Sequence, residues 1–454
     1  MCGYVGDPLQ KLIYGGIKPS DHCIYDERTD TVFVLVNSYN LEIARLYQID
    51  CSTNTIQRKT DLRHSFILKG KIALFGDCLF FKEFDNQAIN LVRMDLRSHI
   101  TDLVTSFTDD VEDFIIDNDT VYLEIWDGKT GNSAIKVLNL LTGGIDEFRL
   151  GEGRNKPICS QEGELFYIHT DYLTPPEIFV YKKGISERLT QSSSVALERR
   201  FHSIQMKTLI TENGLTCKCY YSKETEGRLR PSLIWLHGGP QILSCNQYTP
   251  FELWLCSLGY TVYVPAYRGT LGLGKKWALG ARGKNLGRTD LQDVWETVEK
   301  ALDPALSDVC KVGVAGVSYG GYLALRSAAN IRNLKAVFCF GAICDWRIQQ
   351  ENTDAKNYDY WLLENWYKKT DVDSVSPCFE IDNIRIPVMI THGALDIDVP
   401  YCQVTAYKEL AEYNNKKNIE FYFYYDEGHG LPGYRAENYY HWHKLLEKFL
   451  RKYI

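Results

Sequence analysis

Three side chains in the second half of the sequence have the types and the order needed for nucleophilic acyl transfer. Ser318 stands in a GxSxG pattern, and Asp396 and His429 each follow a short apolar run. A serine hydroxyl is a poor nucleophile at neutral pH, so it needs a base within hydrogen-bonding reach and a carboxylate that orients this base. We therefore predict Ser318 as the nucleophile, His429 as the base and Asp396 as the orienting acid.

The surroundings of Ser318 make the GxSxG pattern more specific than it is alone. The apolar run Val312–Ala315 predicts a strand before it, and the small residues of Tyr322–Ala329 predict a helix after it. Glycines on both sides of the serine let this strand and helix approach each other, which leaves the serine exposed on a strained turn. We expect a nucleophile elbow.

Asp396 and His429 both come directly after predicted strands. The carboxyl ends of parallel strands form the edge where ligands bind in open α/β folds, and the order serine, acid, histidine is that of α/β-hydrolases. His237 and His392 are competing histidines, but each ends a strand before a glycine turn. For these two we expect structural roles.

Acyl transfer also requires hydrogen-bond donors for the developing oxyanion. The residue after the nucleophile, Tyr319, supplies one backbone N–H, and the second comes from the loop after an early strand. That loop is His237-Gly238-Gly239-Pro240. We favour the N–H of Gly239, with Gly238 as the alternative.

Beyond about residue 205 buried apolar strands alternate with amphipathic helices, which predicts a mostly parallel sheet covered on both faces. Apolar residues three and four apart place Leu291, Val294, Trp295, Val298 and Ala301 on one helix face. The segment from Trp442 to Leu450 has the same spacing of apolar residues and is also predicted to be an amphipathic helix. The predicted strands are Ser232–Leu236, Thr261–Pro265, Lys311–Ala315, Ala336–Phe340, Val388–Thr391 and Glu420–Tyr424.

Residues 23 to 192 have a different pattern, in which short β-runs are divided by polar turns. One phrase recurs every 43 to 45 residues, and a further strand stands on each side of it. A period of about 40 to 50 residues with three or four strands is typical of β-propeller blades. The copies are Leu46–Asp50, Leu91–Asp95, Ile135–Asn139 and Ile178–Tyr181.

We therefore expect two domains: a four- or five-bladed propeller over residues 1–204 and an α/β domain over residues 205–454. The first 22 residues and the segment near 193 to 205 are candidates for ring closure or a fifth blade. An irregular all-β sandwich is the alternative for the first domain.

Composition excludes several classes of protein. The net charge of −7 is opposite to the basic surface of nucleic-acid binders, and no apolar run approaches the roughly 18 residues of a membrane span. The 14 cysteines are scattered, without zinc-site spacing, so we expect free thiols and no metal. No secretory signal is found at the start, so we expect a cytoplasmic protein.

At this point the sequence resembles the prolyl oligopeptidase family, and its acylaminoacyl-peptidase branch most of all. The resemblance covers residues 205 to 454 and implies an α/β-hydrolase domain behind a propeller, serine peptidase activity and no cofactor. The motifs that carry it are Leu236–Pro240, Tyr267–Gly274, Gly287–Asp293 and the segments around Ser318, Asp396 and His429.

Two features depart from the family. Its propellers usually have about seven or eight blades, whereas this sequence has room for four or five. The smaller number argues against a central pore that admits only short peptides. Prolyl oligopeptidases and acylaminoacyl peptidases carry an arginine two residues after the acid, where this chain has Asp398. The charge is reversed, so we expect Asp398 to attract a positively charged group of the substrate. The sequence also lacks the adjacent glutamates of the dipeptidyl peptidases.

The predicted function is hydrolysis of short peptides or acyl and aminoacyl amides by a serine peptidase. An esterase or amidase acting on a small metabolite is one alternative, and an inactive binding protein is another. We expect substrate to lie between the two domains, with Trp346 and Trp361 as candidates for its pocket and, with equal weight, for the core. No nucleic-acid or membrane partner is expected, and a homo-oligomer is possible.

Overall fold

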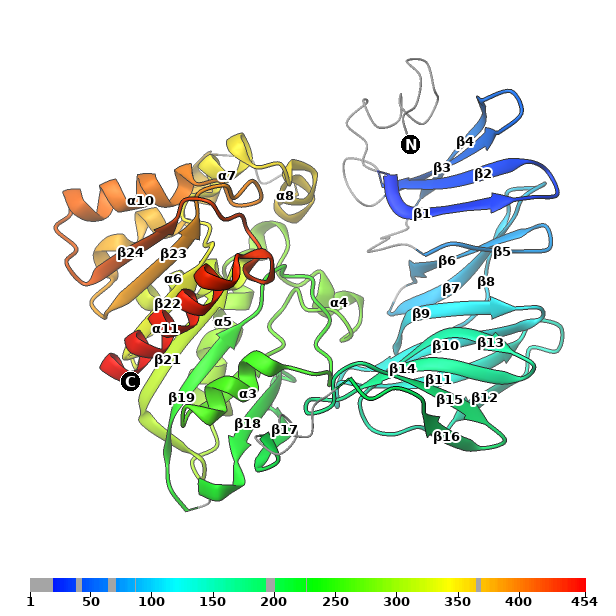
Figure 1. The fold of residues 1–454 in the computed structure, drawn as a ribbon. Coiled ribbons are helices and arrows are strands. Elements are labelled where there is room, and N and C mark those ends of the chain that lie inside the picture. The colour runs from blue at the N-terminus through cyan, green and yellow to red at the C-terminus, as the bar shows by residue number, and fades with distance from the viewer. Residues whose placement is uncertain are drawn as a thin grey trace. The chain divides into compact units, whose positions relative to one another are not determined.

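The computed structural model describes residues 19–37, 43–63, 71–85, 87–192, 201–225, 227–364 and 369–454, which form two compact units (Figure 1). The N-terminal unit comprises Met1–Ser192 with two short segments from later in the chain, Cys245–Gln247 and Gly272–Lys276. The C-terminal unit comprises the remainder, Ser193–Ser244, Tyr248–Leu271 and Trp277–Ile454.

The described residues of the N-terminal unit form four antiparallel sheets, each of four strands that are neighbours in chain order. The first holds β1 (Pro19–Asp26), β2 (Thr31–Asn37), β3 (Ile43–Asp50) and β4 (Thr55–Arg63). The second holds β5 (Ala73–Phe75), β6 (Cys78–Phe84), β7 (Ile89–Asp95) and β8 (Thr101–Leu103). The third holds β9 (Asp110–Asp117), β10 (Thr120–Asp127), β11 (Asn132–Asn139) and β12 (Ile145–Phe148). The fourth holds β13 (Arg154–Gln161), β14 (Glu164–Thr170), β15 (Glu177–Lys182) and β16 (Ile185–Arg188).

These sheets confirm the predicted repeat of propeller-type blades. Each copy of the recurring phrase is the third strand of its sheet, in β3, β7, β11 and β15. Consecutive blades bury apolar side chains against each other: Phe33 and Leu46 of the first blade pack with Phe81 and Met94 of the second. The order of apolar and polar residues along the chain therefore dictated this architecture, because a blade buries its faces only on its neighbours.

The described parts of the segments proposed for a fifth blade belong to other sheets. Pro19–Asp26 is the first strand of the first sheet, and β17, which starts at Ile204, belongs to the sheet of the C-terminal unit. Residues 1–18 and 193–200 lie outside the described residues.

The C-terminal unit is built on one eight-stranded sheet of order β17-β18-β20-β19-β21-β22-β23-β24. β17 and β18 are antiparallel to their neighbours, and the strands from β20 to β24 run parallel. The strands are β17 (Ile204–Ile210), β18 (Thr216–Ser222), β19 (Arg230–Leu236), β20 (Thr261–Pro265), β21 (Ser307–Val317), β22 (Ala336–Phe340), β23 (Val388–Gly393) and β24 (Ile419–Tyr424).

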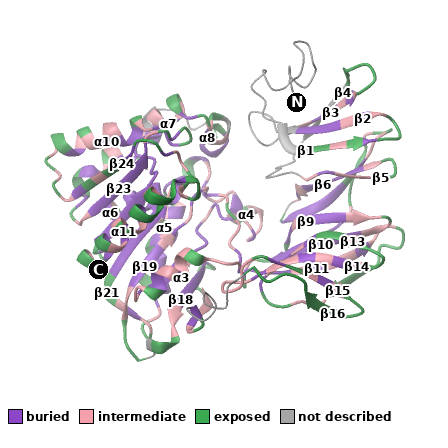
Figure 2. Cartoon of the chain, viewed as in Figure 1, coloured by how far each residue is buried: buried purple, intermediate pink, exposed green. Residues whose placement is uncertain are grey.

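Helices cover both faces of this sheet, which confirms the predicted α/β-hydrolase fold. α3 and α11 lie together on one face, where the rings of Phe251 and Trp442 are 5.9 Å apart, and α5 and α6 lie on the other (Figure 1). Buried residues follow the central strands, and the outer helix surfaces are exposed (Figure 2). The α-helices are α3 (Pro250–Ser257), α4 (Lys275–Ala278), α5 (Thr289–Glu296), α6 (Tyr319–Asn330), α7 (Trp346–Asn352), α8 (Lys356–Leu363), α9 (Lys369–Asp373), α10 (Cys402–Tyr413) and α11 (Ala436–Tyr453).

Short helical turns fill several connections. A π-helical turn, η3 (Thr297–Ala301), continues α5. The 3₁₀ turns are η1 (Lys223–Thr225), η2 (Gly283–Asn285), η4 (Pro377–Phe379), η5 (Ile381–Asn383) and η6 (Leu431–Gly433).

The helix predicted from Leu291 to Ala301 is present, but the prediction that Trp295 lies on its buried face is wrong. Val294, Val298 and Ala301 are buried, whereas Trp295 is 41% exposed. The buried side of α5 carries Asp293 and other acidic residues in place of the tryptophan. Trp295 lies beneath the ammonium group of Lys300.

No helix among the described residues combines the length and the apolar character needed to cross a membrane. The thirteen cysteines in the described part of the chain are free thiols.

Candidate active site

Ser318 occupies the turn between β21 and α6. Its φ of 58° and ψ of −121° put a residue with a Cβ into a sparsely populated region of backbone space. The turn is held in place because the N–H of Ser318 donates to the carbonyl of Phe340 at 2.8 Å, and its own carbonyl accepts the N–H of Tyr322 at 2.9 Å. This is the geometry of a nucleophile elbow.

Two glycines allow this elbow to form. A Cβ at Gly316 would lie 2.2 Å from the carbonyl oxygen of Gly320, and a Cβ at Gly320 would lie 2.2 Å from that of Leu236. Since carbon and oxygen atoms that are not bonded cannot approach so closely, strand and helix meet only with glycine at both positions. The spacing of the motif therefore reflects a close backbone approach.

Ser318, His429 and Asp396 form a continuous hydrogen-bonded chain. The Nε2 atom of His429 lies 3.0 Å from Oγ of Ser318, and its Nδ1 atom lies 2.6 Å from Oδ2 of Asp396. The three residues stand at the ends of β21, β23 and β24, whose carboxyl ends meet at one sheet edge. The structure thus brings together the three side chains that the sequence singled out, at distances suited to general-base activation of a hydroxyl.

The carboxylate of Asp396 is fixed on its other side by backbone donors. Its Oδ1 atom accepts the N–H groups of Asp398 at 3.0 Å and Val399 at 2.8 Å, and the side chain is buried. These bonds leave Oδ2 directed at His429. The loop after β23 therefore positions the acid.

Glu427 positions the loop that carries His429. This carboxylate is 4% exposed, and its Oε1 atom accepts the N–H of Arg435 at 2.9 Å and an amide N–H of Asn438 at 2.6 Å. The contact ties the histidine loop to the start of α11. Sequence reasoning missed Glu427, because an acidic residue in a polar turn has the pattern of an exposed side chain.

Opposing effects act on the pKa of His429. Burial by itself lowers this pKa, whereas the hydrogen bond and charge of Asp396 raise it, with a smaller contribution from the charge of Asp398. The net result is a pKa above the usual value of 6.5. A base held in this way is stronger than a free imidazole.

Asp398 lies at the same edge. Its side chain is exposed, and one of its carboxylate oxygens lies within 4.8 Å of a ring nitrogen of His429 and an oxygen of Asp396. Its backbone carbonyl accepts hydrogen bonds from Gln349 at 2.8 Å and Thr353 at 2.7 Å. The main chain of Asp398 is therefore fixed, and its exposed carboxylate is accessible to a ligand.

Asp396, Asp398 and His429 are also the described residues whose donor atoms are close enough together to hold a metal ion. Both ring nitrogens of His429 already face partners, Asp396 and Ser318. An ion here would have to displace one of them, so the arrangement fits proton transfer better than metal binding.

The loop predicted to supply an oxyanion donor lies against the nucleophile. A Cβ at Gly238 would be 3.2 Å from the Cβ of Ser318. Gly239 has a φ of 109°, which side-chain-bearing residues rarely adopt, and the peptide bond between Gly239 and Pro240 is cis. The backbone of this loop thus runs beside Ser318, as expected for the residues assigned to the oxyanion site.

The competing histidines are held by structural contacts. His237 stacks on Tyr267 at a centroid distance of 4.3 Å, and its Nε2 atom lies 2.9 Å from the hydroxyl of Thr270. Burial lowers the pKa of His237 to about 4. His392 is fully buried, with Nε2 2.8 Å from the carbonyl of Val399, and burial also lowers its pKa.

The two tryptophans proposed as pocket residues lie in the core. Trp346 is 0% and Trp361 is 1% exposed. The ring of Trp346 packs against Tyr319 and Tyr322, and that of Trp361 stacks beneath the guanidinium of Arg282 at 4.5 Å. Their burial speaks against direct contact with substrate and corrects that expectation in favour of the core.

Sequence analysis did not predict another buried contact beside Ser318, the hydrogen bond between Tyr319 and Asp290. The hydroxyl of Tyr319 donates to the carboxylate of Asp290, which also accepts the backbone N–H groups of Gly287 and Leu291. Asp290 is completely buried, and its burial raises its pKa to about 6. This network anchors Tyr319, the residue whose N–H is predicted as the first oxyanion donor.

Two curated proteins are similar to part of this chain. Acylamino-acid-releasing enzyme 2 of Oryza sativa subsp. japonica is 28% identical over 192 residues, which are 38% of this chain and 24% of that protein. Dipeptidyl peptidase family member 6 of Caenorhabditis elegans is 27% identical over 235 residues, or 48% of this chain and 30% of that protein. The matched segments thus span less than a third of either relative.

A solved structure shares the fold of nearly the whole chain. An acylaminoacyl peptidase in complex with Z-Gly-Gly-Phe-chloromethyl ketone superimposes with a TM-score of 0.79 at 17% identity. The match covers 95% of this chain and 70% of that structure, which supports the fold of both units. Residues 247–454 also match the model of the prolyl oligopeptidase family. Over these residues, which are less than half of the chain, the sequence is therefore similar to the prolyl oligopeptidase family.

Proposed function

We propose that this chain is a serine peptidase that hydrolyses short peptides or acyl and aminoacyl amides through an acyl-enzyme on Ser318. The observation that carries the proposal is the hydrogen-bonded chain from Ser318 through His429 to Asp396. An inactive binding domain does not require a strained serine, an imidazole and a buried carboxylate joined in one chain of hydrogen bonds.

In the proposed reaction the Oγ atom of Ser318 attacks the carbonyl carbon of the scissile amide while its proton moves to Nε2 of His429. Asp396 stabilises the imidazolium that forms. The N–H groups of Tyr319 and Gly239 stabilise the tetrahedral oxyanion, with Gly238 as the second candidate. The imidazolium then protonates the leaving amine as the C–N bond breaks, which leaves an ester on Ser318.

Hydrolysis of this ester repeats the same steps with water as the nucleophile. His429 takes a proton from the water as it attacks the acyl carbon, and returns it to Oγ of Ser318 as the ester bond breaks. Acid and enzyme are released. Each proton transfer uses a group already in place, so the proposed cycle requires neither metal nor cofactor.

The substrate class is supported by the names of two relatives, an acylamino-acid-releasing enzyme and a dipeptidyl peptidase family member. Because the matched segments cover less than a third of these proteins, their substrates are a guide to the bond and not to the residue at the cleavage site. Short peptides and small amides or esters are thus the proposed substrates.

Asp398 supports a preference for a positively charged group near the scissile bond. Its exposed carboxylate lies close to His429, so a free amino terminus or a basic side chain would find a partner there. A close, partly desolvated charge pair contributes about 1 to 3 kcal/mol, or roughly 5- to 150-fold in specificity.

Covalent labelling tests the proposal. A fluorophosphonate should add to the wild-type chain and not to Ser318→Ala, because only an activated serine reacts at a useful rate. Intact mass measures the adduct, and circular dichroism establishes that both proteins are folded. A folded wild type that stays unlabelled would refute the catalytic assignment and leave the binding-protein alternative.

Matched substrates separate peptidase from esterase. Acyl-peptides, aminoacyl-nitroanilides and short-chain esters should be compared by kcat/KM, and cleavage of esters alone would favour the small-molecule esterase. Substrates with free and acetylated amino termini should then be compared in wild type, Asp398→Asn and the control Glu409→Gln, an exposed acid on α10. The preference for the free amine should be lost in Asp398→Asn alone.

We also propose a cytoplasmic location, which the free thiols of the described residues support, since reducing compartments keep cysteines unpaired.

A further inference from the structure

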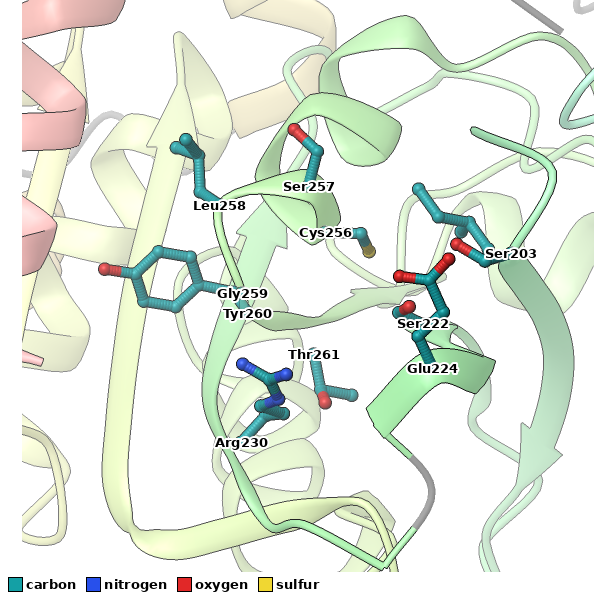
Figure 3. Close-up of a pocket in the computed structure, with 11 residues that line it drawn as sticks. Ser203, Ser222, Glu224, Arg230, Cys256, Ser257, Leu258, Gly259, Tyr260 and Thr261 are labelled. Carbon is teal, nitrogen blue, oxygen red and sulfur yellow. The ribbon is translucent and has the colours of Figure 1, made fainter. Parts of the chain in front are cut away.

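A polar pocket, drawn in Figure 3, lies where β19 and β20 begin. It has a volume of about 330 Å³, at the small end of the range for ligand sites. Arg230 begins β19 and Thr261 begins β20, whereas Ser318 follows the carboxyl end of β21, which is parallel to β19. The pocket is therefore separate from the catalytic side chains, and its lining residues all belong to the C-terminal unit.

A positively charged side chain without a counter-ion faces this pocket. The Nε atom of Arg230 is buried and lacks a hydrogen-bond partner, and its guanidinium forms no ion pair with any residue the structure describes. Gly259 makes room for it, since a Cβ there would lie 3.2 Å from Nη1 of Arg230. A guanidinium with an unsatisfied buried donor is costly, so a bound carboxylate would stabilise it.

A negatively charged side chain lines the same pocket from another element. Glu224 belongs to η1, and its carboxylate points into the space that Arg230 borders (Figure 3). The two side chains do not pair with each other in the described structure. A phosphate or other dianion would meet repulsion from Glu224, whereas a ligand with one charge of each sign would satisfy both.

Hydroxyl-bearing residues complete the lining of this pocket. Ser203, Ser257 and Thr261 are among them. The hydroxyl of Ser257 donates to the carbonyl of Trp254 at 2.6 Å, so towards a ligand it can act as an acceptor. The side chains of Leu258 and Tyr260 point away from Glu224 (Figure 3).

We propose that this pocket binds a small zwitterion, a free amino acid or a dipeptide, with its carboxylate on Arg230 and its ammonium group on Glu224. Its position where β19 and β20 begin makes it a second site, separate from Ser318. Binding there needs no chemistry, so it should persist in a chain that cannot cleave peptides.

Calorimetric titration of the full chain tests this site with L-leucine and glycyl-L-leucine as probes. N-acetyl-L-leucine lacks the ammonium charge and L-leucinamide lacks the carboxylate, so each should bind about 10- to 100-fold more weakly than L-leucine. Titrations in Ser318→Ala should give the affinity of wild type. The Ser318→Ala variant also cannot cleave the dipeptide during the titration, because it lacks the nucleophile.

Two substitutions locate the ligand. Arg230→Gln and Glu224→Gln should each weaken L-leucine binding about 10- to 100-fold, while Arg228→Gln, an exposed arginine nearby that does not line the pocket, should leave it unchanged. Glu224 is exposed, so its variant should fold even where Arg230→Gln does not, and circular dichroism distinguishes these cases.

Three results would overturn the proposal. The first is the absence of a binding heat for L-leucine and the dipeptide at ligand concentrations up to about 10 mM, which are far above the dissociation constant of a useful site. The second is equal affinity for leucine and its two singly charged analogues. The third is binding that is lost in Ser318→Ala or unchanged in Glu224→Gln, because the ligand would then occupy another place on the chain.

Discussion

The Nδ1 atom of His429 lies 2.6 Å from Oδ2 of Asp396. The second oxygen of the same carboxylate accepts two backbone N–H groups of the loop that follows it. Asp396 is thus oriented by the main chain and in turn orients the imidazole, so that the Nε2 atom of His429 carries the lone pair that faces Ser318. Which nitrogen carries the proton follows from this hydrogen bond.

Asp396→Asn should nearly abolish activity without unfolding the chain. An asparagine amide can present its N–H₂ group to Nδ1 and so favour the wrong tautomer of His429, which lowers kcat on the order of 10⁴-fold in serine hydrolases of this kind. The rate of fluorophosphonate labelling measures the loss, and thermal denaturation monitors the fold. A labelling rate within about tenfold of wild type would mean that Asp396 does not orient the base.

Asp398→Asn should shift the pH dependence of kcat/KM. The negative charge of Asp398 favours the protonated imidazole and raises the pKa of His429, and only the neutral imidazole accepts the proton of Ser318. Removing the charge lowers this pKa, so the acid limb of the profile should move to lower pH. Glu409→Gln, on α10 and away from the imidazole, is the control. An acid limb that stays in place or moves to higher pH would contradict the prediction.

Gly320→Ala should destabilise the C-terminal unit. The new methyl group would lie 2.2 Å from the carbonyl oxygen of Leu236 and 2.3 Å from that of His237, which forces α6 away from the sheet at a cost of about 1 to 3 kcal/mol or more. Gly433→Ala is the matched control, because a methyl group there meets no atom within 4 Å. Chemical denaturation should separate the two variants, and equal stabilities would disprove the close packing inferred at Gly320.

Asp359→Asn should change how stability depends on pH. Burial raises the pKa of Asp359 to about 7 from 3.8, opposed by a hydrogen bond from Gln349 and reinforced by the charge of Asp398. The folded chain therefore binds more protons than the unfolded chain between these values, and its free energy of unfolding falls as the pH rises through that window.

The loss amounts to at most about 1.4 kcal/mol for each pH unit. Asp359→Asn cannot ionise, so its gain in stability relative to wild type should be larger when denaturation is measured at pH 8 than at pH 5. The exposed Asp354→Asn serves as control. The same difference from wild type at both pH values would show that Asp359 does not titrate in this range.

The sequence by itself determined the elements and the order of the catalytic candidates. Thr261–Pro265 and Ala336–Phe340 are strands with the bounds predicted for them, because short apolar runs between turn residues have few other conformations. The recurring phrase located the third strand of every blade. The strands depend on residues a few positions apart and the blades on a repeat every 43 to 45 residues, and the sequence displays both patterns directly.

Only the tertiary structure decided which side chains reach one another and which reach solvent. His429 and Ser318 are 111 residues apart in the chain and 3.0 Å apart in space, a distance that the packing of β21 to β24 sets. Periodicity placed Trp295 on the apolar face of its helix, and Trp346 was expected equally in the substrate pocket or in the core. Trp295 is exposed and Trp346 is buried. The unpaired guanidinium of Arg230 was likewise invisible in the sequence, since burial and charge pairing depend on neighbours that are remote along the chain.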